Sequence, residues 1–246
     1  MSAYVVTGGT SGIGLAVAES LLSRPETQVF AVARHAASSQ AGRNLQSTGR
    51  FHFIECDVAE PAQCARGAAA VRQRVAAIEG LVNAAGIIRA GDIETTSDAD
   101  WNDVMRVNLD GIFNTSRAFL PLLRAGSGRA VVNVSSVCSL RPCDTLAYSV
   151  SKAAVDMLTR GMAGTLAREG IRVNCVNPGV VRTNLQAAAG IVEDYEGFLQ
   201  QRARMHPLGR VGEPEDIANA IVFLLGPQAR WITAAHLSVD GGRGGC

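Results

Sequence analysis

The sequence is poor in the features that mark several specialised classes of protein. Aromatic residues make up only 5% of the chain, and 23 basic and 22 acidic residues leave a net charge of +1. Because no basic run and no basic and aromatic stripe stands out, we expect no nucleic-acid partner. No apolar run approaches the roughly 18 residues of a membrane span, and the glycine-rich turn that begins at Gly8 leaves no room for a signal peptide. These absences predict a soluble, cytoplasmic protein without a membrane partner.

The cysteines and histidines lack the spacing of a metal site or of a disulfide framework. The four histidines show no metal-ligand spacing, so we expect no metal site. The six cysteines lack C-x-x-C spacing and form no pattern typical of a small disulfide-linked domain. We therefore predict reduced thiols, as in a cytosolic protein. These residues are His35, His52, His206 and His236, and Cys56, Cys64, Cys138, Cys143, Cys175 and Cys246.

Apolar segments alternate with turns and helical patterns along the whole chain. With 246 residues, 47% of them hydrophobic and 26 of them glycine, the chain is long enough for one full α/β domain. No repeat, linker or shift in composition divides it, so we predict a single domain over residues 1–246. The predicted strands are 3–6, 28–33, 51–56, 80–82, 129–134, 171–176 and one within 235–242, and the predicted helices include 65–75, 101–123 and 214–225.

A glycine-rich turn, T-G-G-T-S-G-I-G over residues 7–14, connects the first strand to a helical pattern. This order of strand, turn and helix is the context in which such a motif binds a dinucleotide. Gly8 allows the tight turn, Gly12 lets the backbone approach the pyrophosphate, and Gly14 permits close packing of the helix on the strand. The N–H groups at the helix N-terminus then face the phosphates. The alternative is a turn that only connects the two elements. The candidate residues are Gly8, Thr10, Ser11, Gly12, Ile13 and Gly14.

The end of the second strand bears on the choice of cofactor. An acidic residue there commonly accepts hydrogen bonds from the adenosine ribose, but in this chain Ala33 is followed by Arg34 and His35. A guanidinium can pair with a 2′-phosphate, which a carboxylate would repel. We therefore predict a preference for NADP. NAD is the alternative if Arg34 is only a solvated residue.

Three more strand ends carry candidate cofactor contacts. Asp57, followed by Val58, either accepts a hydrogen bond from the adenine amino group or caps the next turn. After the fourth strand come small residues, as expected where a backbone passes close to a ligand. The turn after the sixth strand is expected to contact the nicotinamide end. The residues of these two segments are Asn83, Ala84, Ala85 and Gly86, and Pro178, Gly179, Val181 and Thr183.

Two polar residues in apolar surroundings are catalytic candidates. Asn108 lies inside a helical pattern, where its amide needs a partner. It either kinks the helix or frees a carbonyl that holds a water beside Lys152. Ser136 follows the fifth strand, at the sheet end where ligands bind, and its hydroxyl can stabilise charge on a substrate oxygen. A serine nucleophile is the rival interpretation, but no G-x-S-x-G elbow surrounds this serine.

Tyr148 and Lys152 stand one helical turn apart in Y-S-V-S-K. A free tyrosine has a pKa of ~10, and a nearby ammonium is expected to lower this pKa towards neutrality. The pair therefore suits proton transfer to or from a hydroxyl oxygen. An isolated Y-x-x-x-K match is usually an exposed helix pair, but here other motifs accompany it.

Taken in order, these motifs resemble those of the short-chain dehydrogenase/reductase family, in particular its bacterial 3-oxoacyl-reductase-like members. The resemblance covers nearly the whole chain, and it implies a Rossmann-like, doubly wound parallel sheet of about seven strands with helices on both faces. The matching segments are residues 7–14, Asp57-Val58, N-A-A-G at 83–86, Asn108, N-V-S-S at 133–136, Y-S-V-S-K at 148–152, N-P-G-V-V-R-T at 177–183 and the terminal V-D-G-G.

The resemblance also implies a catalytic set and an assembly. Tyr148 would be the general acid in carbonyl reduction or the base in alcohol oxidation, and Lys152 would lower its pKa and bind the nicotinamide ribose. Ser136 would hold the substrate oxygen, and Asn108 would anchor a proton-relay water. Family members are commonly homodimers or homotetramers. The apolar face within 221–225 and the segment around Trp231 fit such an interface, or they complete the core of one subunit.

The chain departs from the family pattern at two places. The family usually places its catalytic serine thirteen positions before the tyrosine, which selects Ser135, whereas the N-V-S-S match selects Ser136. We favour Ser136, with one residue deleted from the loop that contains Cys138 and Cys143. Near the C-terminus, Ala234 stands where family members often have glycine, which affects the loop geometry.

These observations predict an oxidoreductase that transfers hydride between a nicotinamide cofactor and a carbonyl or secondary alcohol, in NADPH-dependent reduction. The alternatives are an NAD-dependent alcohol, diol or sugar dehydrogenase, and a catalytically silent nucleotide-sensing protein. The polar segment 184–207 is either a mobile substrate lid or a static pair of surface helices. Arg89, Arg141 and Arg182 hint at an anionic substrate, although solvated charges are the preferred interpretation. The sequence does not specify the substrate.

Overall fold

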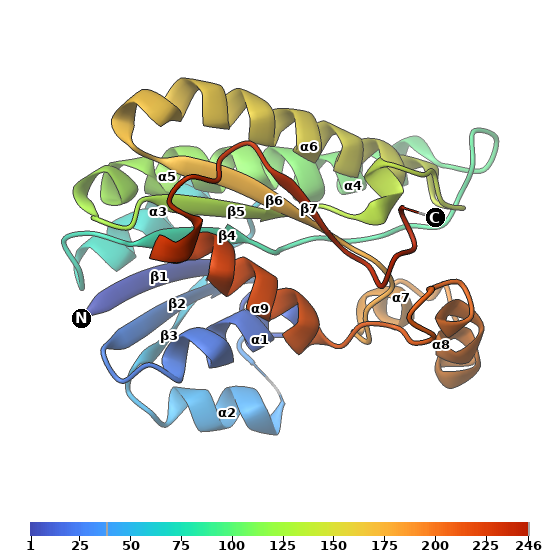
Figure 1. The fold of residues 1–246 in the computed structure, drawn as a ribbon, viewed down its shortest axis with the longest axis horizontal. Coiled ribbons are helices and arrows are strands. Elements are labelled where there is room, and N and C mark those ends of the chain that lie inside the picture. The colour runs from blue at the N-terminus through green and yellow to red at the C-terminus, as the bar shows by residue number, and fades with distance from the viewer. Residues whose placement is uncertain (38, 246) are drawn as a thin grey trace.

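Seven parallel strands form the centre of the molecule, in the order β3-β2-β1-β4-β5-β6-β7 (Figure 1). The computed structural model describes residues 1–37 and 39–245. The chain moves outward from β1 to β3 and then returns to the other side of β1, which is the doubly wound order that the sequence predicts. The strands are β1 (Ser2–Thr7), β2 (Thr27–Ala33), β3 (Phe51–Glu55), β4 (Gly80–Asn83), β5 (Ala130–Val134), β6 (Arg172–Pro178) and β7 (His236–Val239).

Helices cover both faces of this sheet, and Figure 1 shows α1 and α9 on one side and α5 and α6 on the other. Within the described chain, no helix combines the length and apolar character needed to cross a membrane. The helices are α1 (Gly12–Leu22), α2 (Gln40–Gln46), α3 (Pro61–Arg72), α4 (Asp98–Met105), α5 (Gly111–Ala125), α6 (Leu146–Leu166), α7 (Leu185–Ala188), α8 (Tyr195–Ala203) and α9 (Pro214–Leu225).

The central strands β1, β4, β5 and β6 are almost entirely buried because both faces of the sheet are covered there, so they read as nearly continuous apolar runs. Successive side chains of β1 point to opposite faces. Val6 packs in a cluster with residues of α1 and α9, whereas Val5 packs in a second cluster with residues of α3, α5 and α6. The two layers hold the carboxyl ends of the strands at one edge, where the order reverses between β1 and β4 and ligands bind in such sheets.

The structure corrects the predicted helix over 101–123 and decides between the two alternatives for the apolar face of the helix over 214–225. The pattern over 101–123 forms two helices, α4 and α5, joined by a π-helical turn over Arg106–Asp110. In α9, Ile221 and Leu224 are almost completely buried in the core. The apolar face of α9 therefore completes the subunit core, whereas the side chain of Trp231 is 96% exposed.

Candidate active site

The loop between β1 and α1 forms a cradle that requires glycine at three positions. Gly8 and Gly12 have φ angles of 65° and 50°, a conformation that residues with a Cβ rarely adopt. A Cβ on Gly14 would clash with the carbonyl oxygen of Gly8. The side chain of Ser11 does not cap α1, so the first N–H groups of this helix can bind a ligand. The cradle thus fits the pyrophosphate of a dinucleotide.

A cavity of about 690 Å³ adjoins this cradle. Its walls are the loops that follow β1, β2, β4, β5 and β6, so it lies at the edge of the sheet where binding was predicted. Most of the predicted site residues meet here although they are distant in sequence. Those that line the cavity are Gly8, Ser11, Gly12, Ile13, Gly14, Arg34, Ala84, Ala85, Gly86, Ser136, Tyr148, Lys152, Pro178, Gly179, Val181 and Thr183.

The structure does not bring every candidate to the cavity wall. The carboxylate of Asp57 accepts a hydrogen bond from the Ala59 N–H at 2.9 Å, which is the turn-capping alternative. The amide of Asn83 donates to Asn133 at 2.9 Å in the interior, so Asn83 links β4 to β5. The predicted residues outside the cavity lining are Thr10, Asp57, Val58, Asn83 and Asn108.

Tyr148 and Lys152 lie one turn apart on α6, and both are buried. Burial raises the pKa of Tyr148, while a hydrogen bond with the side chain of Ser136 lowers it. This net direction is opposite to the lowering predicted from the sequence. The reason is that the Lys152 Nζ donates to the Val134 carbonyl at 2.8 Å and lies 5.5 Å from the centre of the Tyr148 ring, while the phenol itself is deeply buried.

The charge of Lys152 is set by opposing effects. Burial lowers the pKa of its ammonium to about 8, and the negative charge of Asp156 acts in the opposite direction. Lys152 is therefore mostly protonated below about pH 8. A positive charge at this position favours the phenolate form of Tyr148.

Two neighbouring serines have different surroundings. The side chain of Ser136 shares a hydrogen bond with Tyr148 and accepts one from the Cys138 N–H at 3.1 Å. The hydroxyl of Ser135 instead donates to the main-chain carbonyl of Lys152 at 3.1 Å. Ser136 is thus the serine that shares a hydrogen bond with the tyrosine, and Ser135 ties β5 to α6.

Asn108 lies in the π-helical turn between α4 and α5, behind the cavity wall. Its side chain accepts from the Ile87 N–H at 2.8 Å and donates to the Ile87 carbonyl at 2.9 Å and to Ser151 at 3.1 Å. A Cβ added to Gly86 would lie 3.3 Å from the side-chain Oδ1 of Asn108 and 3.6 Å from the Lys152 Nζ. Asn108 therefore holds the loop after β4 beside α6.

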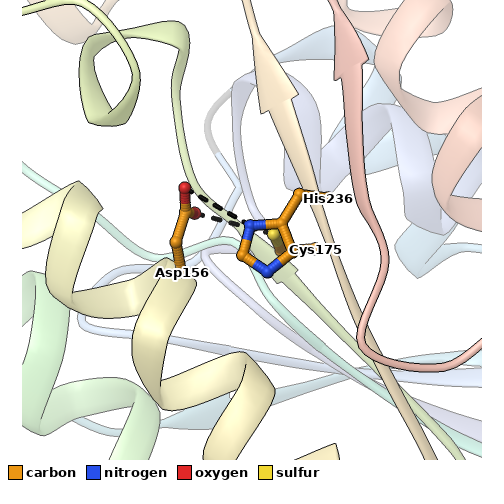
Figure 2. Close-up of side chains that lie close together, drawn as sticks. All are labelled: Asp156, Cys175 and His236. Atoms are coloured by element: carbon orange, nitrogen blue, oxygen red, sulfur yellow. Dashed lines mark hydrogen bonds and ion pairs between the residues drawn. The ribbon is translucent and has the colours of Figure 1, made fainter.

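A cluster that the sequence spacing did not indicate lies next to this site. Figure 2 shows Asp156 of α6, Cys175 of β6 and His236 of β7 side by side. The Cys175 thiol donates to Asp156 over 3.6 Å, and His236 Nδ1 lies 3.4 Å from the same carboxylate. Burial raises the pKa of the Cys175 thiol. The three groups have the donor types of a metal site and lie within 4.8 Å of one another. They come together because β6 pairs with β7 and α6 packs on β6. Residue spacing along the sequence could therefore not reveal this cluster.

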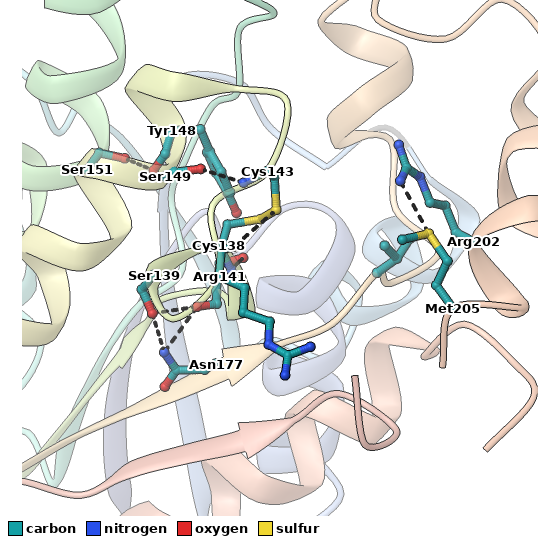
Figure 3. The surroundings of a disulfide bond; sticks show 12 residues. Cys138, Ser139, Arg141, Cys143, Tyr148, Ser149, Ser151, Asn177, Arg202 and Met205 are labelled. Atoms are coloured by element: carbon teal, nitrogen blue, oxygen red, sulfur yellow. Dashed lines mark hydrogen bonds between the residues drawn. A yellow bond between two sulfur atoms is a disulfide. The ribbon is translucent and has the colours of Figure 1, made fainter. Parts of the chain in front are cut away.

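The prediction of reduced thiols is wrong for Cys138 and Cys143, which form a disulfide (Figure 3). The two cysteines are five positions apart, a spacing that differs from C-x-x-C. Both line the cavity. The disulfide therefore closes the loop between Ser136 and Tyr148, the loop in which the choice of Ser136 predicts a one-residue deletion.

Of the three arginines considered for an anionic substrate, Arg89 lines the cavity, whereas Arg141 and Arg182 are not among its lining residues. Arg89 pairs with Asp100 at 3.3 Å and with Asp103 at 3.7 Å. Arg182 pairs with Glu196 at 2.7 Å and with Glu213 at 3.4 Å. Two arginines that the sequence analysis did not select, Arg202 and Arg243, line the cavity. They are 41 positions apart, and no local pattern links them.

Comparisons with known proteins agree with this geometry. A family model described as enoyl-(acyl carrier protein) reductase matches residues 8–243. A galactitol 2-dehydrogenase (L-tagatose-forming) of Cereibacter sphaeroides is 37% identical over 96% of this chain and 92% of its own. The chain belongs to the short-chain dehydrogenase/reductase family.

Other members of the family show the same likeness over the full chain. An NADP-dependent (R)-specific alcohol dehydrogenase of Lentilactobacillus kefiri is 32% identical over 97% of this chain and 94% of its own. The NADPH-bound structure of a short-chain oxidoreductase from Pseudomonas aeruginosa PAO1, which contains an atypical catalytic center, is 34% identical. It covers 98% of this chain and 96% of its own, with a TM-score of 0.89. This short-chain dehydrogenase/reductase is an NAD(P)-dependent oxidoreductase that acts on alcohol or carbonyl groups.

Proposed function

We propose that this short-chain dehydrogenase/reductase reduces a carbonyl group with NADPH. The observation that carries the cofactor preference is Arg34, which directly follows β2 and lines the same cavity as the glycine cradle. A guanidinium at this place offers a bidentate partner to a 2′-phosphate. With Ala33 in the preceding position, no carboxylate stands there to accept bonds from a ribose diol or to repel the phosphate.

Different segments of the cavity wall would bind different parts of the cofactor. The cradle of Gly8, Gly12 and Gly14 would hold the pyrophosphate against the start of α1. The loop of Ala84, Ala85 and Gly86 would pass along the cofactor, and Pro178, Gly179, Val181 and Thr183 would contact its nicotinamide end. Bound NADPH supplies the hydride for the reaction.

The protein's own contribution to the reaction is orientation and proton transfer. Ser136 would donate a hydrogen bond to the substrate oxygen and stabilise the charge that develops there. Tyr148 would transfer its phenolic proton to that oxygen. The ammonium of Lys152 would stabilise the resulting phenolate and hold the cofactor ribose, and Asn108 would hold the loop beside Lys152 and anchor a proton-relay water.

We also propose a substrate lid over residues 184–207, a homo-oligomeric assembly and a cellular location for this protein. Residues of the 184–207 segment, which contains α7 and α8, line the cavity, which supports a substrate lid, although a static wall would line it equally. Large apolar side chains on α5, α6 and near β7 are exposed, among them Phe113, Met157 and Trp231. Their burial in a homodimer or homotetramer would be favourable. We also propose a cytoplasmic location, to be checked by cell fractionation.

The choice of cofactor is tested by calorimetric titration of the purified protein with NADPH and NADH. We expect tighter binding of NADPH, and a loss of this preference of at least about tenfold in Arg34→Asp, because one charge-assisted pair becomes a repulsion. Arg168→Asp makes the same charge change on an exposed residue far along the chain and should keep the preference. Equal binding of both cofactors by the wild type would instead favour an NAD-dependent alcohol, diol or sugar dehydrogenase.

Catalysis is tested by Tyr148→Phe, which keeps the ring and removes the proton donor. We expect this variant to bind NADPH normally and to lose turnover by at least about a hundredfold with a panel of ketones and aldehydes. The wild type should oxidise NADPH in the presence of a panel member. A protein that binds the cofactor but never turns over would point to the nucleotide-sensing alternative.

A further inference from the structure

The substrate cavity carries an excess of positive charge. Among its described lining residues, five are basic and one, Asp144, is acidic. Buried or half-buried cations attract anions strongly, because the surrounding protein screens the charge less than water does. The basic residues are Arg34, Arg89, Lys152, Arg202 and Arg243.

Three of these five cations already have partners or roles. Arg89 lies within ion-pair distance of Asp100 and Asp103. Lys152 donates to the Val134 carbonyl and belongs to the catalytic pair. Arg34 follows β2, where the adenosine part of a dinucleotide lies in this fold. The charges that remain for a substrate are those of Arg202 and Arg243.

Arg202 has no acidic partner at ion-pair distance within the described chain. It belongs to α8, and its guanidinium lies 5.1 Å from the centre of the Phe198 ring. Its Nη1 lies 3.4 Å from the Met205 sulfur. Figure 3 shows Arg202 and Met205 on one side and the disulfide loop with Tyr148 on the other. An aromatic ring and a thioether hold the guanidinium without neutralising it.

Arg243 approaches the same region from the C-terminal segment. It is half-buried, and burial together with the charge of Arg202 lowers its pKa. The nearest carboxylates oppose this shift only partly. One of them, Asp240, already accepts from the N–H groups of Gly242 at 3.0 Å and Gly244 at 2.6 Å. The two arginines are thus close enough to repel each other, which costs free energy unless an anion lies between them.

We propose that Arg202 and Arg243 form a subsite for an anionic group of the substrate, so that the enzyme acts on a ketone or alcohol bearing a carboxylate, sulfonate or phosphate. This inference rests on the proposed function, because it extends the same site from the reacting carbonyl to the remainder of the substrate. Guanidinium groups bind oxyanions through paired N–H donors. An anion bound there would be held across the cavity from Ser136 and Tyr148, and it would orient the carbonyl towards them.

The test is a comparison of matched anionic and neutral ketones. With NADPH, kcat/KM is measured for 4-oxopentanoate against its methyl ester, and for hydroxyacetone phosphate against hydroxyacetone. A sulfonate, 3-oxobutanesulfonate, distinguishes the head groups. We expect at least one anion to exceed its neutral counterpart by about tenfold or more, as for a charged hydrogen bond. The selectivity ratio should fall by about the same factor in Arg202→Gln and in Arg243→Gln.

Arg204→Gln is the matched control. Arg204 is exposed, two positions from Arg202, and does not line the cavity, so its loss should leave the selectivity ratio unchanged. Calorimetric binding of the same anions to the protein with NADP⁺ gives a second readout that needs no turnover. NADPH affinity is measured for each variant, because a subsite for the cofactor phosphates would change that value instead.

The possible outcomes separate this inference from the proposed function. Turnover of the neutral ketones with no anion preference, and no effect of the two arginine variants on the ratio, would overturn the subsite and keep the reductase. A loss of NADPH affinity in Arg202→Gln would also overturn it, in favour of a cofactor contact. If no ketone is turned over, the proposed function fails, and calorimetric binding of the anions still decides whether the two arginines form the subsite.

Discussion

Asp156 lies one helical turn beyond Lys152 on α6, and its carboxylate opposes the effect of burial, which lowers the Lys152 pKa to about 8. The amide of Asn177 donates to both oxygens of Asp156, at 3.3 and 3.2 Å, and so fixes the carboxylate. Asp156, which does not line the cavity, thereby affects the pKa of Lys152, which does.

This relationship predicts the effect of Asp156→Asn on the pH dependence. Lys152 stabilises the Tyr148 phenolate only while it is protonated, that is, below about pH 8. Loss of the Asp156 charge removes an effect that raises the Lys152 pKa, so the pKa falls further. The alkaline limb of the kcat/KM profile for carbonyl reduction should therefore move to lower pH. Asp98→Asn, at an exposed position, should leave the limb in place. A folded Asp156→Asn enzyme with an unshifted limb would contradict the coupling.

Substitution of the two adjacent serines should have different effects, one on catalysis and the other on stability. Ser136→Ala removes the hydroxyl beside Tyr148 and should lower kcat by roughly a hundredfold to a thousandfold, as for the loss of one donor to a developing oxyanion. Ser135→Ala removes only the bond to the Lys152 carbonyl. It should lower the free energy of unfolding by about 1 kcal/mol and leave kcat within about threefold. Steady-state kinetics and urea unfolding measure both effects, and exchanged results would select Ser135 as the catalytic serine.

Ala234 is expected to be a strained position that glycine relieves. Its φ is 59°, in the left-handed region that costs a residue with a Cβ about 1–2 kcal/mol. Because glycine also has more freedom in the unfolded chain, Ala234→Gly should raise the free energy of unfolding by about 0.5–1 kcal/mol. Ala229→Gly, in a 3₁₀ turn with a buried alanine, should change it in the opposite direction. Thermal unfolding of both variants measures these changes, and a destabilised Ala234→Gly would rule out strain at this loop.

Reduction of the Cys138–Cys143 disulfide is expected to weaken substrate binding more than cofactor binding. The bond joins residues five positions apart, and a cross-link over so short a loop stabilises the fold by about 2 kcal/mol in the chain-entropy model. Its loss frees the loop between Ser136 and Tyr148, so KM for the carbonyl substrate should rise several-fold while the Kd for NADPH stays unchanged. Kinetics with and without dithiothreitol test this. A variant with serine at both positions should behave like the reduced enzyme and no longer respond to dithiothreitol, and a response from that variant would assign the effect to other thiols.

Local sequence patterns were sufficient to predict most of the strands and helices and the glycine-rich cofactor cradle. Buried strands appear as short apolar runs, the glycine turn between β1 and α1 has a unique steric pattern, and Tyr148 and Lys152 share a helix face because of helical periodicity. Each of these signals lies within a few residues of chain. For the same reason, the helix over Pro214–Leu225 was predicted with its observed bounds, and the doubly wound parallel sheet followed from the family resemblance.

Only the tertiary structure revealed the contacts and pKa shifts of the site that depend on residues far apart in the chain. Spacing could not choose between Ser135 and Ser136, because the choice depends on which hydroxyl bonds to the main chain of α6 at Lys152 and which bonds to the side chain of Tyr148. Asp156, Cys175 and His236 come together because β6 pairs with β7 and α6 packs on β6. Arg202 and Arg243 line the same cavity although they are far apart in the chain. The direction of the Tyr148 pKa shift was mispredicted because burial, which sequence spacing does not report, raises this pKa more than the hydrogen bond with Ser136 lowers it. Periodicity encodes the elements, whereas the packing of the elements sets the electrostatics of the site.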